Sequence, residues 1–144
     1  MRFIALATIT LASLVLPRFA FAASETTFAT IEVKLDGDKL AKAAAGVHTL
    51  FITIYDEASK APMPYGAMKV ELTKDARGVV YQGKLDSSNV MVMGSGETPK
   101  TLRIKAKLDK DGSAGPDASG DVVGIAEHVK VGSTVTVKID KAIQ

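Results

Sequence analysis

The sequence of 144 residues contains no cysteine and no tryptophan, and it has only two histidines. Without a thiol, the chain can form no disulfide, carry no lipid on a cysteine and attach no haem through a Cys-x-x-Cys-His motif. A blue-copper centre is excluded as well, because that centre needs a thiolate ligand. The fold must therefore be stabilised mainly by burial of apolar side chains.

An excess of one charge is also lacking, since 18 lysines and arginines stand against 16 aspartates and glutamates. Arg2 and Arg18 belong to the N-terminal segment described next, and without them the balance is 16 to 16. Proteins that bind nucleic acid need basic residues gathered on one face. The lysines here are interspersed with acidic residues, so we expect no nucleic-acid role.

The first 22 residues have the three parts of a secretory signal peptide. Arg2 supplies a basic start, an apolar run of 14 residues follows at 3–16, and residues 20–22 (Ala-Phe-Ala) are a small-x-small cleavage site. A helix that crosses a bilayer needs about 20 apolar residues. We therefore predict cleavage after Ala22, a periplasmic protein with no membrane span in its mature chain, and one domain over residues 23–144. Retention of the segment as an anchor is the alternative.

Short segments in which apolar and polar residues alternate make up most of the mature chain. In residues 101–108, leucine, isoleucine and alanine alternate with arginine and lysine, the period of a strand buried on one face. Residues 49–55 are apolar on both faces, which predicts a central strand. We expect strands at about 28–35, 49–55, 67–72, 79–85, 89–93, 101–108, 122–129 (as a short edge strand) and 134–139, and one or two helical turns at 39–46.

Closely spaced turn signals and the lack of a long helical period favour two layered sheets. The pattern predicts an all-β protein, an antiparallel immunoglobulin-like β-sandwich of about seven strands that follows the signal peptide. The Cys…Trp…Cys pattern of antibody domains is absent. The term immunoglobulin-like therefore describes architecture only.

The stretch 101–124 also resembles a known domain. The residues that carry the likeness are Ala106, Lys110, Gly112, Ala114, Gly120, Asp121 and Gly124. They are similar to the run Ala-Arg-Ile-Ser-Lys-x-Gly-x-Ala … Gly-Asp-Leu-x-Gly in the C-terminal immunoglobulin-like domain of the TPR-bearing subunit of bacterial cytochrome c haem lyases. Leu50-Phe51 and Pro62-Met63-Pro64 resemble that domain's Leu-Phe-Val … Pro-x-x-Pro segment. The likeness covers about residues 29–140 and rests on turn and strand residues.

The resemblance implies a periplasmic domain that assists cytochrome c maturation beside the TPR region that captures apocytochrome c. It favours a non-catalytic accessory factor without a cofactor, which binds apocytochrome c or haem-lyase components. The family's membrane anchor and TPR helices have no counterpart in this sequence. One alternative is therefore an accessory subunit of a mature multihaem cytochrome or of a respiratory complex.

A candidate partner-binding segment lies at 62–65. Pro62, Met63, Pro64 and Tyr65 place apolar and aromatic groups on a loop, because the two prolines remove backbone donors and prevent regular pairing. Exposed apolar loops of this kind dock partners. The alternative is that Met63 and Tyr65 fold back to cover the core.

The sequence also contains candidate metal ligands. Met91 and Met93 share one face if they lie on a strand, and with His48 and His128 they would form a Cu(I) site of a periplasmic carrier. If that face is inward, the two methionines simply fill the core. The same histidines with a methionine would be the ligands for non-covalent haem.

Four aspartates in the glycine-rich stretch, Asp109, Asp111, Asp117 and Asp121, resemble an acidic calcium loop. They lack the later ligands of an EF-hand and are typical turn formers beside glycine. A Ser-His-Asp triad would have to use His48 or His128, and the chain has no Gly-x-Ser-x-Gly elbow. We therefore expect no enzyme.

Overall fold

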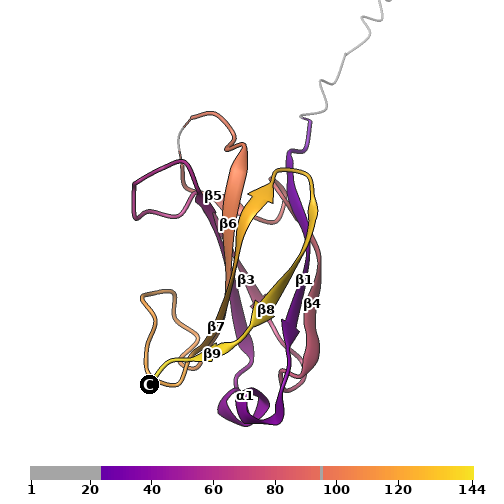
Figure 1. Ribbon diagram of the computed structural model, residues 1–144, viewed down its shortest axis with the longest axis vertical. Coiled ribbons are helices and arrows are strands. Elements are labelled where there is room, and N and C mark those ends of the chain that lie inside the picture. The colour runs from indigo at the N-terminus through magenta and orange to yellow at the C-terminus, as the bar shows by residue number, and fades with distance from the viewer. Residues whose placement is uncertain (1–23, 95) are drawn as a thin grey trace, which may run out of the picture.

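Two β-sheets lie face to face in the computed structural model, which describes residues 24–94 and 96–144 (Figure 1). One sheet has three strands in the order β4-β1-β8, and the other has six in the order β5-β3-β2-β6-β7-β9. The predicted signal peptide lies outside these residues. The elements are β1 (Thr27–Leu35), α1 (Asp38–Ala43), β2 (Thr49–Asp56), β3 (Gly66–Glu71), β4 (Gly78–Asp86), β5 (Met91–Val92), β6 (Thr101–Asp109), β7 (Val122–Lys130), β8 (Thr134–Ile139) and β9 (Lys141–Ala142).

The prediction of a mostly β protein with two layered sheets is confirmed. Each predicted strand segment overlaps a strand of the structure, and β9 is an addition at the C-terminus. The apolar segment 49–55 forms β2, which lies between β3 and β6 inside the six-stranded sheet. The alanine-rich segment forms the single short helix of the described residues, and Gly46 follows it with a φ of 74°, a conformation that glycine adopts without strain.

Two strand relationships differ from the prediction. β8 pairs with β1 in parallel, with Ile31 opposite Val135, so the three-stranded sheet is not antiparallel throughout. The predicted short edge strand at 122–129 is the nine-residue strand β7, which pairs with β6 along most of its length and with β9 at its start. In both cases the strand itself was predicted. Its neighbours depend on the path of the connecting turns, which local sequence does not determine.

The core fills the space between the two sheets. Alternate residues of the central strands point inward and are almost fully buried, as the period of two requires. A fully buried leucine or isoleucine side chain contributes about 1.5–3 kcal/mol to stability, so these strands supply most of it. The inward residues are Ile31, Val33 and Leu35 of β1, Leu50, Ile52 and Ile54 of β2, Leu102, Ile104 and Leu108 of β6, and Val137 and Ile139 of β8.

The two sheets approach each other closely at Gly124 of β7. A Cβ at this position would overlap the backbone of Lys138, and it would lie 2.7 Å from Cα of Ile139. Backbone atoms of a paired strand cannot move aside as a flexible side chain can. Glycine is therefore required where β7 crosses β8.

The outward face of the six-stranded sheet is bordered by two loops. Figure 1 shows both on the left, where they project away from the three-stranded sheet: loop 57–65 near the top and loop 110–121 near the bottom. The part of the outer face between them carries the candidate site. No helix within 24–94 or 96–144 is long and apolar enough to cross a membrane.

Candidate functional site

The outer face of the six-stranded sheet holds an apolar groove of about 600 Å³. Its floor is formed by Phe51, Thr53 and Tyr55, which alternate along β2 with the buried residues of the core and therefore point outward. One wall consists of Pro64, Met91 and Met93, and the other of Ala114, Gly115 and Pro116 from loop 110–121. We call this feature the β2 groove.

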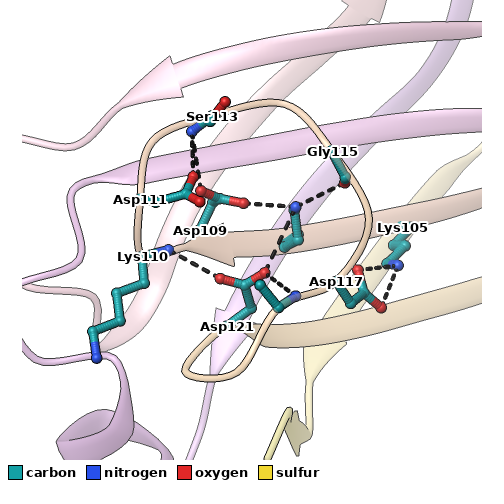
Figure 2. Close-up of polar contacts among 10 residues, drawn as sticks. Lys105, Asp109, Lys110, Asp111, Ser113, Gly115, Asp117 and Asp121 are labelled. Atoms are coloured by element: carbon teal, nitrogen blue, oxygen red, sulfur yellow. Dashed lines mark hydrogen bonds and ion pairs between the residues drawn. The ribbon is translucent and has the colours of Figure 1, made fainter.

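Lys107 holds loop 110–121 against the sheet. Its Nζ lies 2.6 Å from Oδ2 of Asp109 and 3.7 Å from Oδ2 of Asp121, and it donates a hydrogen bond to the carbonyl oxygen of Gly115 at 3.1 Å (Figure 2). The side chains of Lys107, Asp109 and Asp121 are at most 7% exposed. A buried lysine between two carboxylates therefore fixes the position of the groove's second wall.

The charges of this cluster stabilise one another. Burial disfavours the charged form of Lys107, yet the hydrogen bond and charge of Asp109, with the charge of Asp121, raise the pKa of Lys107 above its ordinary value. Burial would likewise raise the pKa of Asp109, but hydrogen bonds from Lys107 and nearby groups lower it. Both residues are therefore charged at neutral pH.

The aspartates of the loop bond to strand β6 or to backbone groups at the loop (Figure 2). Asp117 accepts hydrogen bonds from Nζ of Lys105 at 2.6 and 2.7 Å. Oδ1 of Asp121 accepts a hydrogen bond from the backbone N–H of residue 110 at 3.0 Å, and Oδ2 accepts one from the backbone N–H of residue 118 at 2.9 Å. Oδ1 of Asp111 accepts the N–H of Ser113 at 2.7 Å. The four residues considered above as a calcium loop thus bond to lysines and to backbone donors.

Sequence reasoning missed the burial of Lys107. The alternation in residues 101–108 placed Lys105 and Lys107 on the solvated face, and the structure buries Lys107 because loop 110–121 folds back over that face. The available signal was the spacing of Lys107 and Asp109, two residues apart on one strand and therefore on one face. That spacing permits an ion pair, but only the loop makes the pair buried.

Cations surround the aromatic floor of the β2 groove. Nζ of Lys107 lies 5.7 Å, and Nζ of Lys69 5.9 Å, from the ring centre of Phe51. The guanidinium carbon of Arg103 lies 4.6 Å from the ring centre of Tyr55. Cations over an aromatic face are attracted to it electrostatically. These contacts hold the two rings in place at the floor.

The methionine wall faces outward rather than into the core. Met91 lies opposite Ala67, which lies opposite Thr53 of the groove floor, so all three share the outer face of the sheet. Met91 is 73% and Met93 44% exposed. A Cβ added at Gly66 of β3 would lie 2.7 Å from a side-chain atom of Val90, so the chain entering β5 lies tightly against β3.

In loop residues 62–65, one side chain folds back over the core and another is exposed, so each of the two predicted alternatives holds for part of the segment. The ring of Tyr65 folds back and packs edge-on against Phe28, with ring centres 5.7 Å apart. Its backbone carbonyl accepts the N–H of Met93 at 2.8 Å. Met63 is 69% exposed, and Pro64 lines the β2 groove. The loop therefore covers the core with its tyrosine and presents its methionine.

The histidines lie away from the methionine pair. His48 precedes β2, and its Nε2 lies 4.0 Å from Oδ1 of Asp75. Along the strand direction it is about five residues, or roughly 16 Å, from the position of Met91. His128 is on β7, four strands from β5 and therefore roughly 19 Å away, with Nδ1 3.1 Å from Oε1 of Glu57. The structure does not bring His48 or His128 together with Met91 and Met93. Within 24–94 and 96–144, no three imidazole or carboxylate groups converge as metal ligands.

Beside the β2 groove, strand β3 has an open edge. β5 pairs only with Gly66 and Ala67, and no other described strand pairs with β3 on that side. Leu72 donates its N–H to the carbonyl of His48, the residue before β2, and hydrogen-bonded pairs alternate along an antiparallel ladder. The N–H and carbonyl of Lys69, three residues earlier, therefore point away from β2, toward the open edge. Lys69 also lines the groove.

Comparisons of the chain with protein-family models, with curated proteins and with solved structures gave no match. The resemblance to the haem-lyase domain therefore remains a prediction from the residues quoted above. The geometry of the β2 groove and of the β3 edge is the main basis for a functional proposal.

Proposed function

We propose that this protein is a non-catalytic binding module that docks an extended polypeptide segment along the open edge of β3 and in the β2 groove. The observation that carries the proposal is the position of Lys69, whose backbone N–H and carbonyl face the open edge while its side chain lines the groove. An apolar surface beside unpaired backbone groups suits a peptide that pairs as a strand.

An added strand would meet both parts of the site at once. Its backbone would bond to β3 beyond the end of β5, and every second side chain would point to the outer face, as in any strand. That face offers the apolar floor and the methionine wall. Methionine is unbranched and adapts to differently shaped apolar groups, so the wall suits a range of sequences.

The sequence resemblance supplies the first partner to try. It implies an immunoglobulin-like sandwich in the periplasm that assists cytochrome c maturation, and apocytochrome c is an unfolded polypeptide with backbone groups free to pair. Holocytochrome c is folded and offers far fewer such groups. We therefore propose a periplasmic accessory factor that binds apocytochrome c, and the alternative, an accessory subunit of a mature cytochrome complex, predicts the opposite preference.

The experiment is a titration of the protein with haem-free, reduced cytochrome c polypeptide and, separately, with the folded haem-containing form, followed by amide NMR. Shifts at Phe51, Lys69 and Met91 with the haem-free polypeptide alone are the expected result. Binding of the folded form alone would favour the alternative subunit role. No binding of either would contradict a cytochrome partner.

A matched pair of variants tests the docking mode. Lys69→Pro removes the N–H at the open edge, where proline is tolerated in a strand, and Lys69→Ala removes only the side chain. We expect Lys69→Pro to abolish binding and Lys69→Ala to retain most of it. Equal affinities of the two variants would contradict strand addition.

A further inference from the structure

Three exposed methionines gather at one end of the six-stranded sheet. Met63, Met91 and Met93 are 69%, 73% and 44% exposed, and with Val92 they make up four of the six large apolar side chains that are exposed in the described residues. Leaving such a side chain in water forgoes the free energy that its burial would supply. A cluster of three thioethers in water suggests a ligand.

Met93 connects the other two methionines. With Met91 it lines the β2 groove, and with Met63 it lines an adjoining hollow of about 540 Å³. Met91 and Met93 are two residues apart, so their side chains leave the chain on the same face. The three methionines therefore line two hollows that share Met93.

The backbone holds the two methionine segments together. The carbonyl oxygen of Tyr65 accepts the N–H groups of Met93 and Gly94 at 2.8 and 3.1 Å. A Cβ at Gly94 would lie 2.9 Å from the Tyr65 ring, so glycine lets the chain pass over that ring. The segments 62–65 and 91–94 are thus held together by backbone hydrogen bonds, and the flexible thioether side chains extend from them.

We propose that Met63, Met91 and Met93 form a site for a soft monovalent metal ion, Cu(I) in biological use and Ag(I) as its redox-stable probe. Thioether sulfur is a soft, neutral donor that selects Cu(I) over harder divalent ions. This ligand set replaces the set of Met91, Met93, His48 and His128 considered from the sequence, because the fold places both histidines elsewhere. The site goes beyond the proposed docking function and does not depend on it.

The test is a titration of the full chain with Ag(I), observed through the methyl resonances of ¹³C-methyl methionine. Met68 is the internal control: it borders the β2 groove, but it lies opposite Ile52 and packs against the core, and it is not among the exposed methionines. We expect the methyl signals of Met63, Met91 and Met93 to shift together and to saturate near one equivalent. The Met68 signal should stay in place, and Zn²⁺ should produce no comparable shift.

A leucine variant measures how much the sulfur of Met93 contributes to metal affinity. Met93→Leu keeps the apolar volume and removes the central sulfur, so Ag(I) affinity, and Cu(I) affinity under reducing competition with bicinchoninate, should fall at least about tenfold. Met68→Leu should leave both affinities unchanged. Unshifted methyl signals at equimolar Ag(I), or unchanged affinity in Met93→Leu, would overturn the site.

The docking variant separates this proposal from the previous one. Lys69→Pro alters the edge of β3 and removes no sulfur, so it should leave Ag(I) affinity unchanged while abolishing peptide binding. Loss of Ag(I) binding in Lys69→Pro, with the amide spectrum otherwise intact, would contradict a site made of the three thioethers.

Discussion

Lys107 and Asp109 are two residues apart on β6, and Nζ of the first lies 2.6 Å from Oδ2 of the second with both side chains almost excluded from solvent. Both residues of this ion pair also bond to the loop that walls the β2 groove, Lys107 to the carbonyl of Gly115 and Asp109 to the N–H of Ser113. The cluster contains one ammonium and two carboxylates, because Asp121 lies 3.7 Å from the same nitrogen. The stability of the loop and the shape of the groove therefore depend on one lysine.

Removal of that lysine should destabilise the protein strongly. Lys107→Ala leaves two carboxylates buried without their cation, and breaking a buried pair in this way costs about 3–5 kcal/mol. Urea unfolding followed by circular dichroism measures the change. Lys138→Ala, a substitution at an exposed strand lysine of β8, is the matched control and should leave the midpoint unchanged. Similar midpoints for the two variants would contradict the assigned role of Lys107.

The cluster should also make stability depend on pH in acid. Because the pKa of Asp109 is lowered in the folded state, its stabilising effect is complete above the unfolded value of 3.8 and is lost as the pH falls through the lowered folded value. Asp109→Asn should therefore be less stable than the wild type at neutral pH and approach it below pH 3.8. The measurement is urea stability of both proteins at a series of pH values. A difference that stays constant down to the lowest pH would contradict this linkage.

The raised pKa of Lys107 predicts that stability also falls in alkaline solution. A raised folded pKa gives stability that is complete below the unfolded value of 10.5 and is lost as the pH rises through the folded value. Hydrogen exchange of the N–H of Ser113, which bonds to Asp109 and Asp111, should be compared in wild type and Lys107→Met at neutral pH. Faster exchange in the variant would show that the ammonium orders the loop.

Gly124 should tolerate no side chain. Gly124→Ala places a methyl group against the backbone of Lys138, so we expect a loss of about 3 kcal/mol or failure to fold. Gly115→Ala is the control, because a Cβ there meets no atom within 4 Å. Thermal unfolding of both variants checks the contrast, and a Gly124→Ala protein as stable as the wild type would show that β7 and β8 are less tightly packed.

The methionine wall should contribute to docking more than to stability. Met91→Lys introduces a charge at a side chain that is 73% exposed, so stability should stay the same while affinity for the haem-free polypeptide falls about tenfold or more. Ile125→Lys alters another exposed residue of the same sheet, outside the groove, and should bind normally. If the two variants bind equally well, the peptide lies elsewhere.

The positions of most strands could be predicted from the sequence, because each depends on the residues of its own segment. The alternation in residues 28–35 and 134–139 marks β1 and β8, and the apolar run at 49–55 marks the central β2. Prolines at 62 and 64 correctly predicted a loop, since they cannot donate to a ladder. Each of these features depends on residues within one segment.

The candidate site was only partly readable. Met91 and Met93 share a face in any strand, so their pairing was predictable, but which way they face depends on the register of β5 with β3. The open edge of β3 had no sequence signal, because it follows from the two-residue length of β5. The separation of His48 and His128 from the methionines likewise follows from strand order.

The sequence by itself determined where most strands lie and that at least one face of them is apolar, because side-chain direction alternates with every residue of extended chain. The tertiary structure decided which faces are covered. It buried Lys107 beneath its own loop, left three methionines in water, and set β8 parallel to β1. These outcomes depend on contacts between segments far apart in the chain, and the free energies of such contacts cannot be inferred from one segment alone.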